Sequence, residues 1–195
     1  RAEYRILLRQ DDADMRLTER SYNLGLASKE RYDRLCSKRE KVEEIIAFAK
    51  SFSIKPALIN ETLERLGTTP LAHGCKLIDL IGRPQITLAN MSEVIRPLGA
   101  LIGDIAERKE EIVEAAEIRI KYNGYIRRER EVADKMLRLE NIKIRGKFDY
   151  DGIKSLSTEA RQKLIKIDPE TLAQASRIPG VSPSDINVLL VLMGR

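Results

Sequence analysis

Residues 105–144 form the longest stretch of this sequence with one helical pattern. Apolar residues recur there mostly three, four or seven positions apart, the spacing of an amphipathic helix with one buried stripe. Gly124 interrupts the pattern, and a glycine inside a helix costs about 1 kcal/mol relative to alanine. We therefore predict a long amphipathic helix with a kink or a close backbone approach at Gly124. The expected stripe contains Ile105, Ile112, Val113, Ala116, Ile120, Tyr122, Tyr125, Ile126, Val132, Ala133, Met136 and Leu137.

The polar face of this helix changes from acidic to basic along its length. Residues 107–117 hold five Glu against one Arg and one Lys, whereas residues 119–147 hold ten Lys or Arg against four acids. Acids near the amino end and bases near the carboxyl end suit the helix dipole. A solvated face with favourable end charges therefore explains much of the pattern, and nucleic-acid binding by the basic half is the alternative.

Composition narrows the class of protein. At 195 residues and 43% hydrophobic content, the chain is long enough for one or two compact units. No apolar run approaches the roughly 18 residues that span a bilayer, and the amino end shows no signal segment, so we expect a cytoplasmic protein without membrane insertion. Cys36 and Cys75 lie far apart and outside any CxxC motif, which argues against a disulfide framework or metal site. Because the sequence lacks an initiator Met, we expect a fragment of a longer protein.

The rest of the chain is predicted to consist of short helices joined by tight turns. A β-type run at residues 4–8 is the one strand-like segment, and the Gly- and Asp-containing connector at 145–152 is typical of a domain boundary. We therefore predict an all-α fold with a helical domain, residues 18–147, built on the long helix, and a small carboxyl-terminal three-helix subdomain, residues 150–195. The expected shorter helices are 18–24, 29–52 capped by Ser28, 57–66 beginning near Pro56, 76–81, a piece within 85–98 capped by Asn90 or Ser92 and broken at Pro97, 159–167, 168–176 capped by Asp168, and 186–193.

Signatures of catalysis are scarce. The motifs GxGxxG, GxxxxGK[ST], GxSxG and HExxH are all absent. His73 is the one histidine and has no acidic or Cys neighbour in sequence. The cluster of Asp11, Asp12 and Asp14 is more typical of turn chemistry than of an acid–base pair. We therefore predict no catalytic, cofactor-binding or metal-binding residue in this chain.

The basic half of the long helix offers a candidate phosphate-binding face. Lys121, Arg128, Lys135 and Arg138 follow one another at intervals of seven, seven and three, which places them on one side of a helix. Tyr122 and Tyr125 can supply stacking faces for bases. Glu129, Glu131 and Asp134 can instead pair with the arginines three or four positions away, so an ordinary solvated face remains open. The candidate RNA-binding residues are Lys121, Tyr125, Arg127, Arg128, Lys135, Arg138, Lys143 and Arg145.

The carboxyl-terminal segment offers a second candidate site. Residues 178–185 are similar to the turn of a helix–turn–helix hairpin, where backbone amides can hold a phosphate, but the same turn can simply join two packed helices. Residues 186–193, INVLLVLM, are apolar on nearly every side, more than a 45-residue tail needs for its own core. We therefore expect a protein partner to dock there.

Five blocks of sequence carry a resemblance to a known family. They are RAEYRILLRQDDADMRLTE (1–19), KYNGYIRRE (121–129), LENIKI (139–144), FDY (148–150) and PETLAQASRIPGVSPSDINVLLV (169–191). In this order they resemble the carboxyl-terminal region of the tRNA uridine 5-carboxymethylaminomethyl modification enzyme, the glucose-inhibited division protein A (GidA, MnmG) family. The resemblance covers nearly the whole chain.

The resemblance implies that the chain is the tail of an enzyme that modifies the wobble uridine of tRNA with FAD and NADH, works with a partner tRNA modification GTPase, and forms a homodimer. FAD and the catalytic cysteines belong to the family's amino-terminal part, so Cys36 and Cys75 inherit no role and residues 1–17 are a remnant of the FAD domain. The family's helical tail is associated with binding tRNA and the GTPase; a pure protein–protein docking module with little RNA contact is the alternative. The implied partner-binding residues are Ile178, Pro179, Gly180, Val181, Ser182, Asp185 and Ile186.

Overall fold

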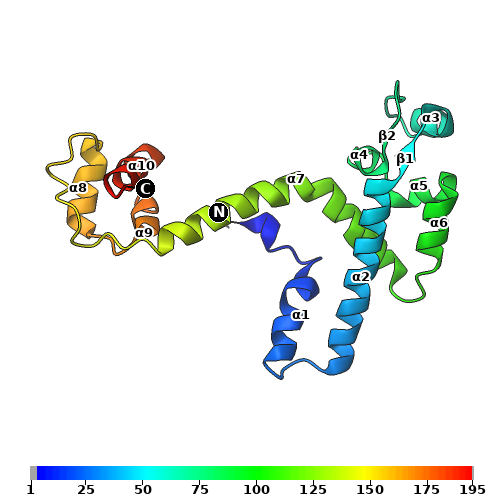
Figure 1. Cartoon of the computed structure of the whole chain (residues 1–195), viewed down its shortest axis with the longest axis horizontal. Coiled ribbons are helices and arrows are strands. Elements are labelled where there is room, and N and C mark those ends of the chain that lie inside the picture. Colours follow the sequence, from blue (N-terminus) through cyan, green and yellow to red (C-terminus); the bar gives the residue numbers. More distant parts are fainter. Residues whose placement is uncertain (1–3, 195) are drawn as a thin grey trace. The chain divides into compact units, whose positions relative to one another are not determined.

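The computed structural model describes residues 4–194, and within that range the chain is built from ten α-helices, one short 3₁₀ helix and one two-stranded ribbon (Figure 1). The predicted all-α class is confirmed. The chain divides into two compact units, unit 1 (Arg1–Arg127) and unit 2 (Arg128–Arg195). The long helix α7 (Lys109–Glu140) contributes residues to both, and each unit is described separately below.

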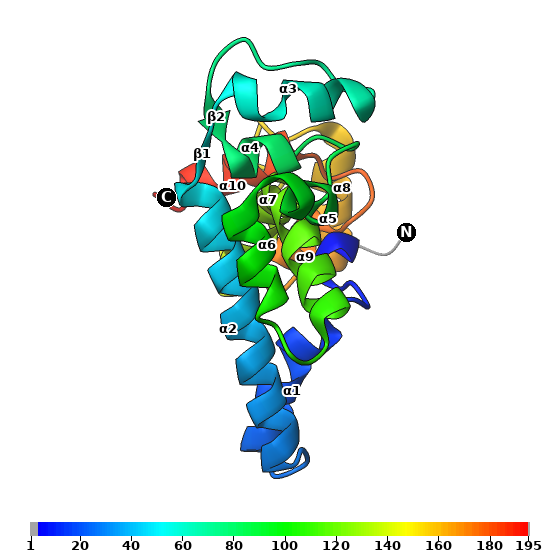
Figure 2. The same ribbon diagram turned by 90° about the vertical axis from the view of Figure 1, so that its right-hand side faces the viewer.

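Unit 1 is organised around the 23-residue helix α2 (Lys29–Ser51). The side chain of Ser28 caps its amino end by accepting a hydrogen bond from the Arg31 amide, as predicted. Helix α1 (Ala13–Asn23) lies beside the amino-terminal half of α2 (Figure 1), with Thr18 buried between them. The antiparallel strands β1 (Ser53–Ile54) and β2 (Cys75–Lys76) gather at the other end of α2 with α3 (Pro56–Arg65) and α4 (Leu77–Ile81) (Figure 2).

The core of unit 1 forms where α2 meets α4, α5 (Leu88–Val94), α6 (Arg96–Gly103) and the first half of α7. Burial of apolar side chains stabilises such a core by about 25 cal/mol per Å² removed from water. The buried residues that α7 contributes are four positions apart, so the core covers only one narrow side of this helix. The buried residues include Val42, Ile45 and Ala49 of α2, Leu77 and Leu80 of α4, Met91 of α5, Leu98 of α6, and Ile112, Ala116 and Ile120 of α7.

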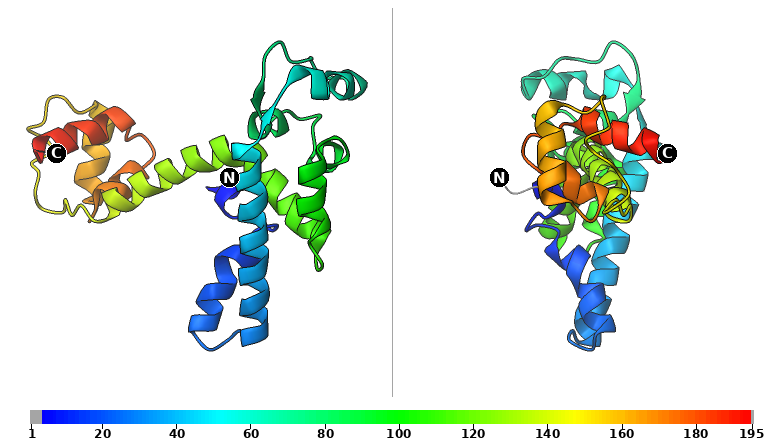
Figure 3. Two further views of the ribbon diagram at one scale, coloured as in Figure 1. Left: turned by 45° about the vertical axis from the view of Figure 1, so that its right-hand side comes forward. Right: turned by 90° about the vertical axis from the view of Figure 1, so that its left-hand side faces the viewer.

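Unit 2 packs α8 (Thr158–Ile167), α9 (Leu172–Ser176) and α10 (Pro183–Leu192) around the carboxyl end of α7 (Figure 3). The segment after α7 is bonded to the segment before α9, because the Ile144 amide donates to the Glu170 carbonyl and the Leu172 amide to the Ile142 carbonyl, both at 2.9 Å. Ile142 and Ile144 are buried in the core of unit 2. The compact units meet at 127/128, and the division into domains 18–147 and 150–195 stays a prediction.

Several local predictions were wrong. Residues 5–7 form a 3₁₀ helix (Arg5–Leu7) where a strand was expected. Thr87 caps α5 in place of Asn90 or Ser92, and Pro97 lies in the first turn of α6 instead of breaking a helix, because a first-turn proline lacks only an amide that has no partner there. Thr171 caps α9 in place of Asp168, which ends α8 with a left-handed backbone.

The predicted buried stripe of α7 is found only at its two ends. Tyr122, Tyr125, Val132 and Leu137 are all exposed, whereas Leu139 is buried in the core of unit 2. Apart from its chain neighbours and the backbone of α7 itself, no described atom lies within 4 Å of the position that a Cβ atom would occupy at Gly124. Of the two features expected there, a kink or a close backbone approach, the close approach is therefore absent among the described residues.

Candidate nucleic-acid interface

Unit 2 presents three of the predicted cations on one side of α7. Arg128, Lys135 and Arg138 are exposed and lie seven and three positions apart, which returns to nearly the same side of a helix. Lys135 and Arg138 form no ion pair with any of residues 4–194. Their charges are therefore turned to solvent and available to an anion.

The segment that follows α7 adds two more of the predicted cations to unit 2. Lys143 is exposed, and its backbone is held by an antiparallel bridge to Thr171. Arg145 Nε donates to the Asp168 carbonyl at 3.2 Å and lies 3.8 Å from the Asp168 carboxylate. Because the Arg145 and Asp168 side chains are both more than half exposed, water screens this pair and it contributes little stability.

Unit 1 holds the remaining three predicted RNA-binding residues. Lys121 Nζ lies 2.8 Å from a Glu117 carboxylate oxygen, and Glu117 also accepts a bond of 2.8 Å from the Leu88 amide at the start of α5. Lys121 is thus engaged within the fold. Tyr125 and Arg127 are exposed, and the Tyr125 ring centroid lies 6.2 Å from that of Tyr122.

Asp185, a predicted partner-binding residue, is buried and connects the starts of two helices. Its carboxylate accepts bonds from the Ser157 and Ser182 amides, each at 2.8 Å, and from both serine hydroxyls. Ser157 caps α8 and Ser182 caps α10. Burial favours the neutral acid, but the four hydrogen bonds outweigh it and lower the pKa of Asp185. One carboxylate thereby fixes how α8 and α10 begin.

The other residues of the predicted partner site divide between core and surface. Ile178 and Ile186 are buried, so they support the turn from below. Pro179, Gly180 and Ser182 are exposed, and Val181 is half-buried. Gly180 has φ +94, a backbone conformation that favours glycine, and the Pro179 carbonyl accepts a hydrogen bond from Lys163 Nζ. These contacts hold the turn in place, and binding of a partner protein at this turn stays a prediction.

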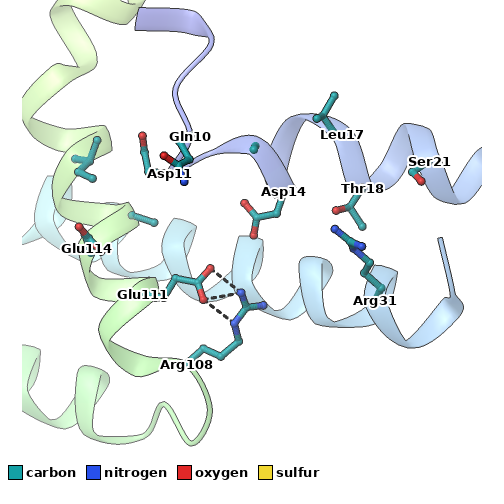
Figure 4. A pocket seen from close by; sticks show the side chains of 13 residues that line it. Gln10, Asp11, Asp14, Leu17, Thr18, Ser21, Arg31, Arg108, Glu111 and Glu114 are labelled. Atoms are coloured by element: carbon teal, nitrogen blue, oxygen red, sulfur yellow. Dashed lines mark hydrogen bonds and ion pairs between the residues drawn. The ribbon is translucent and has the colours of Figure 1, made fainter. Parts of the chain in front are cut away.

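A cavity of about 800 Å³ lies in unit 1 between α1, α2 and the start of α7 (Figure 4). Arg108 pairs with Glu111 inside it, and Asp14 and Arg31 also line it. Lys38 of α2 is 2% exposed and bonds to two of the lining residues, Asp14 and Glu111. Sequence reasoning missed Lys38, although its position three after Leu35 and four before Val42 places it on the buried side of α2.

No group of His, Cys, Asp and Glu within residues 4–194 is arranged to hold a metal ion. His73 is exposed in the loop after α3, and both cysteines are free thiols. Within the same residues, none of the helices combines the length and apolar character that crossing a membrane requires.

Two family models match the chain in succession. Residues 29–130 match the "tRNA modifying enzyme MnmG/GidA C-terminal helical domain", and residues 132–195 match the "tRNA modifying enzyme MnmG/GidA C-terminal helical bundle". Together with the helical fold, these matches define the chain as a helical carboxyl-terminal region of a tRNA-modifying enzyme. The chain belongs to the MnmG/GidA family, and the resemblance found in the sequence is confirmed.

Relatives in this family are similar over the whole chain. It is 70% identical to the tRNA uridine 5-carboxymethylaminomethyl modification enzyme MnmG of Phocaeicola vulgatus and 71% identical to that of Bacteroides fragilis, and it spans 31% of the length of each. The crystal structure of Aquifex aeolicus GidA in form II is similar with a TM-score of 0.62 and 33% identity, covering all of this chain and 29% of that one.

Proposed function

We propose that the chain binds tRNA and docks a partner GTPase as part of an enzyme that modifies the wobble uridine of tRNA. The observation that carries the proposal is the exposed cationic side of α7 in unit 2, formed by Arg128, Lys135 and Arg138. Lysine and arginine side chains that neutralise phosphates release bound counterions, which supplies much of the affinity for nucleic acid. The names of the related enzymes, which include tRNA, support the choice of ligand.

The test is a triple charge reversal, Arg128→Glu, Lys135→Glu and Arg138→Glu. We expect weaker tRNA binding at every salt concentration, and a plot of log K against log salt that is shallower by about 2 to 3 units, since each lost phosphate contact removes about 0.7 to 0.9. The matched control reverses three exposed lysines away from α7, Lys55, Lys154 and Lys166, with the same change in net charge. Equal losses in the two variants would show that only overall charge matters and would refute the assigned face.

A second candidate function, protein docking with little RNA contact, is favoured by exposed apolar side chains in unit 2. Val191 and Leu192 of α10 are 72% and 55% exposed, and Ile165 and Ile167 of α8 are also exposed. The variant Val191→Asp with Leu192→Asp leaves the buried residues of α10 in place. If capture of the GTPase is lost in this variant, and the triple charge reversal changes neither that capture nor tRNA binding, the docking function is preferred.

The finer properties of the whole enzyme are part of the same proposal. FAD and NADH are assigned to the roughly two thirds of the relatives' length outside this chain, since no described strand leads through a glycine-rich turn into a helix as a dinucleotide site requires. A homodimer, the remnant of an FAD domain at residues 1–17 and a cytoplasmic location follow from the family resemblance. Binding of FAD by a full-length relative but not by residues 1–195 would agree with this division.

A further inference from the structure

Two neighbouring tyrosines of α7 are exposed in unit 1. Tyr122 and Tyr125 are 45% and 58% exposed, and their ring centroids lie 6.2 Å apart with the ring planes inclined by 51°. Residues three apart are neighbours on one side of a helix, so the two rings form a continuous aromatic surface. The pair stabilises an isolated helix by only about 0.2 to 0.5 kcal/mol, far less than burying two tyrosines would contribute.

The core of unit 1 does not require these rings. The side of α7 that faces this core carries Ile112, Ala116 and Ile120. An α-helix turns by about 100° per residue. Tyr122 follows Ile120 by two residues and Tyr125 follows it by five, so the tyrosines lie about 160° and 140° around the helix from Ile120. Folding of unit 1 therefore leaves an aromatic surface facing away from its own core.

Charges beside the rings indicate the kind of ligand. Arg119 precedes Tyr122 by three positions, so that ring has a cation about one turn away on its own side of the helix. Lys121 precedes Tyr125 by four positions, but it is held by Glu117 at 2.8 Å. Arg119 pairs with Glu43 at 2.7 Å, but both side chains are more than a third exposed, and such a pair exchanges for a phosphate at small cost. Exposed aromatic rings next to cations suit a nucleotide better than an apolar peptide, because a nucleotide offers both a base to stack and a phosphate to pair.

We propose that Tyr122 and Tyr125 form a stacking platform for unpaired bases of the bound RNA. The inference rests on the proposed tRNA binding and adds to it the part of the RNA that is recognised, a loop or single-stranded end. Bases inside an A-form stem are stacked on one another and cannot reach an aromatic side chain, whereas unpaired bases can.

The experiment compares two RNA probes on the whole chain, a hairpin with 2-aminopurine in its unpaired loop and a fully paired duplex of equal length. For Tyr122→Ala with Tyr125→Ala we expect hairpin affinity to fall at least about fivefold per lost stack, with duplex affinity and the salt slope unchanged. Quenching of 2-aminopurine fluorescence on binding should also be lost. Alanine is a better helix former than tyrosine, so the variant keeps α7 intact.

A matched variant, Tyr122→Phe with Tyr125→Phe, keeps the rings and removes only the hydroxyls, so its hairpin affinity should stay close to that of the unchanged chain. Unchanged hairpin binding in the double alanine variant, or equal loss for hairpin and duplex, overturns the stacking platform. If the stacking platform is overturned in this way but the reversal of Arg128, Lys135 and Arg138 still abolishes tRNA binding, the proposed function stands without the stacking platform. If the unchanged chain binds neither probe nor tRNA, the proposed function itself fails.

Discussion

Lys38 Nζ lies 2.5 Å from Oε1 of Glu111. This ion pair links the middle of α2 to the start of α7 inside unit 1. A second carboxylate, that of Asp14 in α1, lies 2.7 Å from the same ammonium group. Burial opposes the charge on Lys38, but the hydrogen bonds to Asp14 and Glu111 outweigh it, so the pKa of Lys38 is raised. Burial likewise opposes the charge on Glu111, and the bonds from Lys38 and Arg108 lower its pKa. One buried cation therefore fastens three helices together.

Replacing this cation should destabilise unit 1. In Lys38→Met the side chain keeps its apolar length, but Asp14 and Glu111 lose their shared partner and repel each other. We expect a loss of about 2 kcal/mol in the free energy of unfolding, below the range for fully buried pairs because both carboxylates are partly exposed. Urea denaturation measures the loss, and hydrogen exchange should show that α1 loses protection first.

The control for Lys38 uses another ion pair between the same two helices. Arg39 of α2 lies 3.0 Å from Glu19 of α1, with side chains 39% and 48% exposed. Because exposed pairs contribute about 0 to 1 kcal/mol, Arg39→Met should change stability by less than 1 kcal/mol. Equal losses for Lys38→Met and Arg39→Met would contradict the special role of the buried lysine.

The double cap made by Asp185 should make the stability of unit 2 depend on pH. The folded-state pKa of Asp185 is lowered relative to an unfolded value of about 3.9, so its contribution is complete above that value and is lost as pH falls toward the folded pKa. Asp185→Asn should cost about 1 to 2 kcal/mol at pH 7, and the difference from the unchanged chain should shrink below about pH 4. Asp151→Asn, at an exposed aspartate of the same unit, should show neither effect.

Capping residues allowed the starts of some helices to be predicted from the sequence. Ser28 caps α2 as predicted, because a serine before an apolar helical pattern satisfies the first free amides. Ser157 caps α8 in the same way. The start of α9 was misplaced because Asp168-Pro169 carries the same signal. The bond from the Ile144 amide to the Glu170 carbonyl holds residues 168–171 outside the helix, and a single sequence does not reveal such a long-range pairing.

The candidate interface was predictable to a similar degree. The exposure of Lys135 and Arg138 follows from their charge, since lysine and arginine are rarely buried. The ion pair between Lys121 and Glu117 could also be predicted, because Glu117 lies four residues before Lys121. The exposure of Tyr122 and Leu137 could not be predicted, since periodicity shows that a helix has an apolar side but not whether another element covers it.

The hydroxyl of Tyr150 is buried in unit 2 and has no hydrogen-bond partner among the described residues. Burial raises the pKa of Tyr150, and the negative charge of Asp168 raises it further, so the group stays neutral at physiological pH. Tyr150→Phe removes a polar atom without a partner and should leave unit 2 equally stable or up to about 1 kcal/mol more stable by thermal unfolding. A loss of more than 1 kcal/mol would show that an ordered water or a partner molecule satisfies the hydroxyl.

Gly124 and Gly99 are both glycines inside helices, and they should respond to alanine in opposite directions. At Gly124 a Cβ atom would meet nothing within 4 Å, so Gly124→Ala should raise the free energy of unfolding by about 1 kcal/mol through helix propensity alone. At Gly99 in α6 a Cβ atom would lie 2.7 Å from the Ser92 carbonyl oxygen, so Gly99→Ala must displace α5 and should destabilise unit 1. Neither glycine has a positive φ, so an alanine can adopt the backbone conformation at both positions. Urea denaturation of the two variants therefore shows how a nearby backbone changes the effect of an added Cβ atom. Destabilisation by Gly124→Ala would contradict the open surroundings of Gly124 and would favour a close backbone approach there, which the sequence predicted as one of two alternatives, the other being a kink.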